Sequence, residues 1–146
     1  MESTIHASAV LVGAHAVLIR GSSGSGKSRL ALSLIQAFQN EHVRFARLVA
    51  DDRALLEAHN GRLLVRPAGA LAGLIEVRGL GIRRLPYEPV AVVGSVVDLA
   101  APDAERLPGQ AQRMAVIAGI ELPRLAVAAG ELALPILLAF LMTGEG

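Results

Sequence analysis

Residues 21–28 read Gly-Ser-Ser-Gly-Ser-Gly-Lys-Ser and fill every fixed position of the Walker A pattern. A short apolar run, residues 16–19, comes directly before this loop, and residues 29–38 carry apolar side chains at the spacing of an amphipathic helix. A glycine-rich loop between a strand and a helix suits phosphate binding, because N–H groups at the helix N-terminus face the anion. The stretch therefore predicts a nucleotide-phosphate site in an α/β fold, in preference to a flexible Gly/Ser turn.

Each residue of the loop is a candidate for the nucleotide site: Gly21, Ser22, Ser23, Gly24, Ser25, Gly26, Lys27 and Ser28. Lys27 is placed to reach the β- and γ-phosphates, and the Ser28 hydroxyl to bind Mg²⁺. ATP and Mg²⁺ are accordingly the expected cofactors.

Short apolar and valine-rich runs on both sides of the loop predict a mixed rather than purely parallel sheet in one domain spanning 1–146. Asn60-Gly61 is a strong signal for a hairpin turn. The expected strands cover residues 10–12, 16–19, 45–50, 55–58, 63–66, 74–77 and 90–99.

Composition limits the class of protein. The chain has 146 residues, 53% of them apolar, a net charge of +1 and no cysteine. A filled core is expected, disulfides and cysteine metal sites are excluded, and no block of Lys and Arg indicates a nucleic-acid partner. The first residues lack the basic stretch of a signal peptide. The apolar run at 132–142 is shorter than the roughly 20 residues that span a bilayer, so we expect a buried C-terminal helix, no membrane partner and a cytoplasmic location.

Two adjacent acids, Asp51 and Asp52, end the apolar run 48–50. In P-loop proteins an acid at the end of a neighbouring strand holds Mg²⁺ or its water, and an acid near the γ-phosphate accepts a proton from the attacking hydroxyl. Two acids can divide these duties because successive residues at a strand end point in different directions. An ordinary turn or helix cap is the structural alternative.

Residues 75–82, Ile-Glu-Val-Arg-Gly-Leu-Gly-Ile, form a third element. Glu76 and Arg78 are expected to alternate along a strand and share one face, and Gly79 and Gly81 then permit a sharp turn near a ligand. A salt bridge beside an ordinary turn explains the same residues.

The chain contains, in this order, the segments HASAV, GSSGSGKS, LVADDR and IEVRGLGI. In sequence and in order these segments resemble the HPr kinase/phosphorylase family, bacterial enzymes that act on a serine of the phosphocarrier protein HPr. The resemblance covers residues 5–81 and only the catalytic domain of longer members. It implies a P-loop kinase domain similar to the nucleotide-binding core of phosphoenolpyruvate carboxykinase, HPr or an HPr-like paralogue as partner, and a homohexamer.

The resemblance also implies roles for residues of this chain. His6 matches a histidine near the catalytic centre, Asp52 the base for phosphorylation and the acid for the reverse step, and Asp51 a supporting metal ligand. Glu76 matches the second Mg²⁺ ligand, with Arg78 in the family's signature. Arg106 matches a downstream catalytic arginine.

One segment departs from the family. Before the last helix the family carries a basic segment associated with dephosphorylation, whereas residues 125–131 here are Leu-Ala-Val-Ala-Ala-Gly-Glu. We therefore expect a better kinase than phosphorylase, unless Arg124 replaces the missing charge. A small-molecule P-loop kinase and a nucleotide-binding regulatory module remain the alternative functions.

Overall fold

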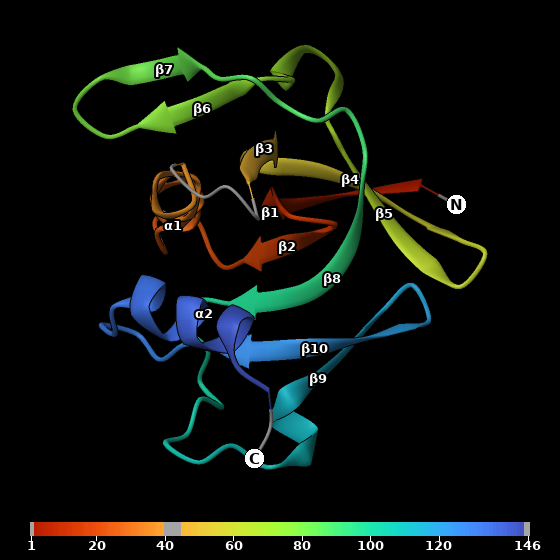
Figure 1. Cartoon of the computed structure of the whole chain (residues 1–146), viewed down its shortest axis with the longest axis vertical. Helices are drawn as coiled ribbons and strands as arrows, with labels where there is room; N and C mark the ends of the chain where they lie inside the picture. Colours follow the sequence, from red (N-terminus) through yellow and green to blue (C-terminus); the bar gives the residue numbers. More distant parts are fainter. Residues whose placement is uncertain (1, 40–44, 145–146) are drawn as a thin grey trace.

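The computed structural model describes residues 2–39 and 45–144. It has an α/β fold built on a mixed sheet, with helices on one side (Figure 1). The elements in these residues are β1 (Glu2–Val12), β2 (His15–Arg20), α1 (Lys27–Ala37), β3 (Ala46–Ala50), β4 (Arg53–His59), β5 (Arg62–Pro67), η1 (Gly69–Leu71), β6 (Leu74–Val77), β7 (Gly81–Arg84), β8 (Ala91–Asp98), η2 (Gln110–Arg113), β9 (Met114–Ile117), β10 (Ile120–Ala126) and α2 (Ala133–Met142).

The main sheet follows the order β2-β1-β4-β5-β8-β10-β9, with β3 beside β1. Because β2 also pairs with β8, the first five strands of this order close into a ring. The β2–β8 and β8–β10 pairs are parallel, and the remaining pairs of the main sheet are antiparallel. The predicted mixed sheet is therefore confirmed, and every predicted strand overlaps an observed one.

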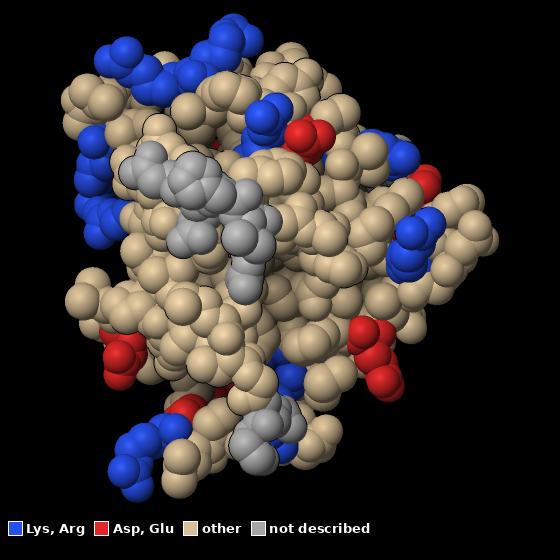
Figure 2. Space-filling view, in the orientation of Figure 1, with Lys and Arg blue, Asp and Glu red and all other residues tan. Residues whose placement is uncertain are grey.

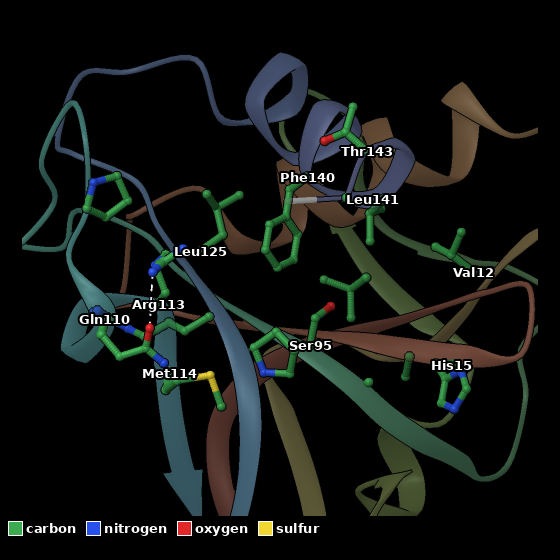
Figure 3. Close-up of a pocket in the computed structure, with 17 residues that line it drawn as sticks. Val12, His15, Ser95, Gln110, Arg113, Met114, Leu125, Phe140, Leu141 and Thr143 are labelled. Carbon is green, nitrogen blue, oxygen red and sulfur yellow. Dashed lines mark hydrogen bonds between the residues drawn. The ribbon is translucent and has the colours of Figure 1, made fainter. Parts of the chain in front are cut away.

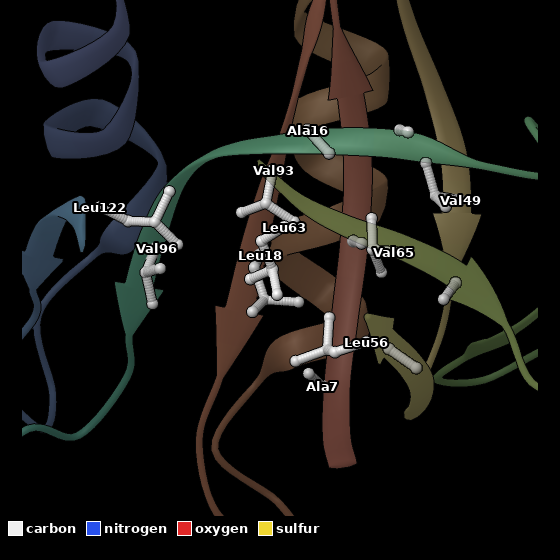
Figure 4. Packing of buried hydrophobic residues seen from close by; sticks show 14 of the residues in the cluster. Ala7, Ala16, Leu18, Val49, Leu56, Leu63, Val65, Val93, Val96 and Leu122 are labelled. Atoms are coloured by element: carbon white, nitrogen blue, oxygen red, sulfur yellow. The ribbon is translucent and has the colours of Figure 1, made fainter. Parts of the chain in front are cut away.

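Side chains alternate across the strands and fill two separate cores. In β2, Leu18 belongs to the core enclosed by the strands, which also includes Leu56 and Val65 (Figure 4). Val17 and Ile19 point the other way and pack with both helices. Helix α1 buries Leu30, Ala31 and Leu34 in this second core, as its apolar spacing predicts.

The β4–β5 and β6–β7 hairpins project to different sides of the molecule (Figure 1). Asn60 and Gly61 have φ angles of 51° and 76°, as expected for the turn between β4 and β5. Strands β6 and β7 form a sheet of their own, and every residue of β7 is exposed. Strand β6 ends at Val77, so Arg78 lies in the turn and not on the strand with Glu76, contrary to the sequence-based expectation.

The expectation of a buried C-terminal helix is wrong. In α2 only Leu137 is fully buried, whereas Ile136 and Met142 are 44% and 66% exposed. The apolar run is long enough to cover one side of α1 and the sheet, but its opposite side faces outward. No helix among the described residues is long and apolar enough to cross a membrane.

Charged side chains are distributed unevenly over the surface. Figure 2 shows basic side chains gathered at the top and upper left, the region that Figure 1 assigns to the β6–β7 hairpin and α1. The hairpin contributes the exposed Arg78, Arg83 and Arg84. The middle of the same face is mostly uncharged.

Candidate functional site

The Walker A loop lies between β2 and α1, as the sequence predicts. Gly24 and Gly26 have φ angles of 82° and 99°, a region that favours glycine. The Gly26 carbonyl accepts a hydrogen bond of 2.9 Å from the Leu30 N–H, which closes the first turn of α1. The N–H groups of this first turn therefore remain available to an anion.

Lys27 is 94% buried, which is unusual for a lysine. Its ammonium group donates hydrogen bonds of 2.9 and 3.1 Å to the carbonyl oxygens of Gly21 and Ser22. These bonds hold the ammonium group against the loop whose bound phosphates it is expected to contact. The loop and its lysine thus form one compact cationic cradle.

Asp51 lies at the centre of a hydrogen-bond cluster. It is buried, and its Oδ1 accepts hydrogen bonds from Ser28 Oγ at 2.6 Å and Ser8 Oγ at 2.8 Å. Its Oδ2 accepts a bond of 3.1 Å from the Glu76 N–H. A single carboxylate therefore connects β1, the P-loop helix and β6.

Ser8 was missed by the sequence analysis. It is fully buried, and besides donating to Asp51 it accepts a hydrogen bond of 3.2 Å from the Asp52 N–H. The sequence feature that points to Ser8 is its polarity inside an apolar strand. It lies two positions from His6 and therefore on the same face. Ser8 fixes both acids of the pair relative to β1.

Asp52 occupies a strained turn. Its φ is +65°, and the Arg53 N–H donates a 2.7 Å hydrogen bond to the Asp51 carbonyl across it, which defines a γ-turn of the rare, strained kind. The turn directs the Asp52 side chain outward, 65% exposed, while Asp51 points inward. His6 Nδ1 lies 4.0 Å from Asp52 Oδ1. Strain of this kind is concentrated at functional sites.

A pocket of about 550 Å³ brings most of the predicted residues together. Its walls come from the P-loop, the start of α1, Asp52 and the end of β6, and the lining residues are Ser23, Gly24, Ser25, Gly26, Lys27, Ser28, Arg29, Leu32, Asp52, Glu76, Val77 and Arg78. Within the described residues no ion pair joins Glu76 to Arg78. The salt-bridge alternative is therefore not supported, and both side chains are free to face a ligand.

A second hollow of about 370 Å³ adjoins this pocket. The two share Gly24, Ser25, Gly26 and Arg29, and residues 127–134 form the far wall of the second. The segment that departs from the family thus lies beside the P-loop. Arg29, which the sequence analysis did not select, is exposed and borders both hollows.

A partly buried ion-pair network supports the base of the P-loop. Arg20, the last residue of β2, donates two hydrogen bonds of 2.7 and 2.9 Å to Asp98, the last residue of β8. Arg124 donates to Asp98 at 2.6 Å and to both oxygens of Asp103 at 2.8 and 3.0 Å. Burial raises the pKa of Asp98, but the hydrogen bonds from the two arginines outweigh this effect and hold it below its usual value. Arg124 is therefore engaged in this network, and it lines neither hollow at the P-loop.

Two predicted features are not assembled by this geometry. Arg106 lies on the exposed loop between β8 and η2 and does not line the pocket, so its catalytic role stays a prediction. No group of three or more His, Cys, Asp or Glu able to hold a metal occurs in the part of the chain that the structure describes. Mg²⁺ bound with phosphates needs only one or two protein ligands, however, and the Ser28–Asp51 pair offers two oxygens together.

Comparison with known proteins agrees with this geometry. Residues 1–86 match the model of the HPr Serine kinase C-terminal domain family. Similar curated proteins include the HPr kinase/phosphorylases of Clostridium beijerinckii, 41% identical over 81 residues, and Clostridium tetani, 40% identical over 85 residues. These alignments cover 56% and 58% of the chain but only 24% and 26% of the two relatives. The chain thus matches about a quarter of the length of these relatives.

The fold is also similar to a solved structure, the Hpr(Ser) kinase/phosphatase from Coxiella burnetii. The TM-score is 0.74 at 26% sequence identity, and the match covers 95% of this chain and 87% of the other. The structural likeness therefore extends past residue 86, where the family match ends, into β8, β10 and α2. On this evidence the chain belongs to the HPr Serine kinase C-terminal domain family.

Proposed function

We propose that this protein transfers the γ-phosphate of ATP, in the presence of Mg²⁺, to a serine of HPr or an HPr-like phosphocarrier protein. The observation that carries the proposal is that Asp52 and Ser28 line the same pocket as Lys27, with Ser28 hydrogen-bonded to the buried Asp51 behind it. Family membership and the names of the similar proteins support the choice of reaction and acceptor.

The chain offers a suitable group for each part of the nucleotide. The P-loop N–H groups and Lys27 fit the phosphates, and the hydroxyl of Ser25 is buried without a hydrogen-bond partner among the described residues, so a phosphate oxygen suits it. Ser28 and Asp51 would hold Mg²⁺, with Glu76 as the proposed second acidic ligand; the ion would neutralise charge on the phosphates. The adjoining hollow, walled by residues 127–134, is available for the nucleoside.

The proposed reaction is an in-line displacement. Asp52 accepts the proton of the acceptor serine hydroxyl, whose oxygen bonds to the γ-phosphorus while the bond to the β–γ bridging oxygen breaks and ADP leaves. The 65% exposure of the Asp52 side chain suits a base that must reach a hydroxyl on another protein. His6, 4.0 Å away, is placed to hold the Asp52 carboxylate in position.

Dephosphorylation of phosphoserine is the reverse step implied by the names of the relatives. It brings two phosphate groups together and needs additional positive charge. Residues 128–131 border the P-loop with no basic side chain, and Arg124 is engaged by Asp98 and Asp103. We therefore propose that the forward reaction is the faster one.

The remaining proposals rest on resemblance. We propose that residues 1–146 form one domain with a nucleotide-binding core similar to that of phosphoenolpyruvate carboxykinase, that it assembles as a homohexamer, and that it acts in the cytoplasm. The ring of strands joined to a helical layer supports the single-domain proposal.

A phosphotransfer assay separates the candidate functions. The full chain is incubated with Mg²⁺ and γ-labelled ATP, with purified HPr, with an HPr variant whose acceptor serine is alanine, or with neither. Label on HPr but not on its alanine variant supports the protein kinase. ATP binding without label on HPr would favour the nucleotide-binding regulatory module, and label on a small metabolite would favour a small-molecule kinase.

A further inference from the structure

Arg29 lies where the two hollows at the P-loop meet. It is the third residue of α1, directly after Ser28, and it lines both the larger hollow, of about 550 Å³, and the smaller one, of about 370 Å³. Three uncharged residues of the P-loop complete the shared lining: Gly24, Ser25 and Gly26. Arg29 is therefore the one charged side chain among the described residues that lines both hollows.

The position of Arg29 is unfavourable for the helix itself. The N-terminal end of a helix carries a partial positive charge, so acidic side chains stabilise its first turn and basic ones destabilise it. The first turn of α1 has no acidic residue and holds both Lys27 and Arg29. The P-loop carbonyl oxygens hold Lys27, whereas the guanidinium group of Arg29 makes no hydrogen bond to any residue in the described parts of the chain. A cation kept at such a place without a protein partner is typical of a ligand-binding side chain.

The acidic side chains of the two hollows leave Arg29 unpaired. Asp52 and Glu76 line the larger hollow, and Glu131 lines the smaller one. No ion pair joins any of them to Arg29 in the part of the chain that the structure describes. Arg29 is also exposed, so its charge is available to an anion that lies across the junction of the hollows.

The parallel strands determine which way a nucleotide lies across this junction. β2, β8 and β10 run parallel, and Asp98 at the end of β8 is in register with Arg20 and Ala126 at the ends of the other two. The segments that follow these three ends line the smaller hollow: 24–26, 99–100 and 127–131. A pocket of about 810 Å³ lies instead near the start of β2, where His15 lines it (Figure 3). Because ligands of α/β folds bind beyond the carboxyl ends of the strands, the smaller hollow is the place for the nucleoside.

A nucleotide that lies this way has its α-phosphate at Arg29. Lys27, Ser28 and Asp52 line the larger hollow, where the γ-phosphate must lie for the proposed transfer. The α-phosphate joins the nucleoside to the two terminal phosphates and therefore falls at the junction. An arginine suits a phosphate there, because its planar guanidinium group donates two parallel hydrogen bonds to the phosphate oxygens.

We propose that Arg29 binds the α-phosphate and makes the site select nucleotides over inorganic pyrophosphate. The phosphate then supplies the negative charge that the first turn of α1 lacks. This inference rests on the nucleotide site proposed above, but it does not depend on which molecule accepts the γ-phosphate.

The probes are ATP, ADP and inorganic pyrophosphate, each titrated with Mg²⁺ into the full chain and followed by calorimetry. ATP and ADP carry an α-phosphate, whereas pyrophosphate corresponds only to the two terminal phosphates of ATP. Arg29→Gln should weaken ATP and ADP binding by the same factor, about 10- to 100-fold, because a hydrogen-bonded charge contact is lost. Pyrophosphate binding should weaken about threefold or less, since a more distant charge acts on it through solvent.

Two further variants and a stability measurement separate binding from structure. Arg29→Lys keeps the charge but not the planar pair of donors, and it should restore only part of the ATP affinity. Arg62→Gln, the matched control, removes an exposed arginine that lines none of the three pockets and should change no affinity. Without nucleotide, Arg29→Gln should unfold at the same or a higher urea concentration than the wild type, because a cation is removed from a helix N-terminus. A merely structural role would instead lower the stability of this variant.

Several results would overturn the proposal. Weaker ATP binding with unchanged ADP binding would place Arg29 at the γ-phosphate instead. An equal loss of pyrophosphate binding would show a general attraction for anions, and unchanged binding of ATP and ADP would show that Arg29 takes no part. A wild type that binds ATP but does not label HPr would refute the proposed kinase reaction alone, whereas one that binds no nucleotide would refute both.

Discussion

The Ser28 hydroxyl donates a 2.6 Å hydrogen bond to Oδ1 of Asp51, which joins the P-loop helix to the end of β3 across 23 positions of sequence. The same Oδ1 accepts a bond from Ser8, and Ser8 in turn accepts one from the Asp52 N–H. The two acids are thereby held in different roles. Asp51 is turned inward to the P-loop, and Asp52 is turned outward to the pocket.

Ser8→Ala should lower phosphotransfer about 10- to 100-fold, because Asp52 loses the bond that fixes its turn and small displacements are costly in catalysis. The KM for ATP should change less than kcat, because Ser8 does not line the pocket and reaches the nucleotide site only through Asp51. Steady-state kinetics measures both constants. Ser8→Thr keeps the hydroxyl and should restore most of the rate; a failure of this rescue, with the fold intact, would count against the positioning role.

Lys27→Ala should remove nucleotide-dependent activity while the fold persists. Loss of one donor to developing phosphate charge costs about 2.7–4 kcal/mol in the transition state. Circular dichroism and calorimetric titration with ATP check the fold and the binding. Turnover at the wild-type rate in this variant would remove the P-loop from the mechanism.

Glu76→Gln should raise the Mg²⁺ concentration needed for the half-maximal rate, because a neutral amide is a poorer ligand for a hard cation. The measurement is the initial rate as a function of Mg²⁺ at fixed ATP. Arg83→Gln, on the neighbouring exposed strand, is the control. An unchanged Mg²⁺ requirement would show that Glu76 is not a ligand.

Asp98 should make the free energy of unfolding depend on pH in acid. Its pKa is lowered in the folded chain from an ordinary value of 3.8, so in this range the unfolded chain binds more protons than the folded one. The stabilisation is complete above pH 3.8 and is lost as pH falls through the folded pKa. Urea unfolding across this range should show a smaller pH dependence for Asp98→Asn. An identical slope in the variant would show that Asp98 is not the responsible group.

Dephosphorylation of HPr phosphoserine by inorganic phosphate should be slower than phosphorylation by ATP. The physical reason is the lack of basic side chains in residues 128–131 beside the P-loop. Release of labelled phosphate, measured with Mg²⁺ and without nucleotide, gives the reverse rate. Equal rates would contradict the prediction. In that case Arg124→Ala should lower the free energy of unfolding and not only the rate of dephosphorylation, because Arg124 joins Asp98 to Asp103.

The local features of the site follow from the sequence. The Walker A loop, its flanking strand and helix, the Asn60-Gly61 turn and the acids after β3 all depend on short-range patterns, and the structure places them as expected. The ring closure could not be predicted in this way, because the β2–β8 pairing joins residues about 77 positions apart (Ala16 and Val93).

Long-range partners account for the other differences. In the sequence alone Ser8 cannot be distinguished from any other small polar residue, because its partner Asp51 lies 43 positions away. Arg20 and Asp98 are 78 positions apart and give no local signal of pairing. The apolar composition of α2 predicts burial, but the surface available to cover it is set by the packing of α1 and the sheet. Arg106 was selected by resemblance alone, and the pocket does not include it.

The measurement that tests the central claim most directly is the transfer of labelled γ-phosphate from ATP to HPr by the wild type and by Asp52→Asn, with ATP affinity measured in parallel. We predict label on a serine of HPr with the wild type, and a rate about 10²–10⁴-fold lower with Asp52→Asn, because the amide cannot accept the proton. ATP affinity should be unchanged. A near-normal rate with Asp52→Asn, or no labelled HPr from a wild-type protein that binds ATP, would contradict the account.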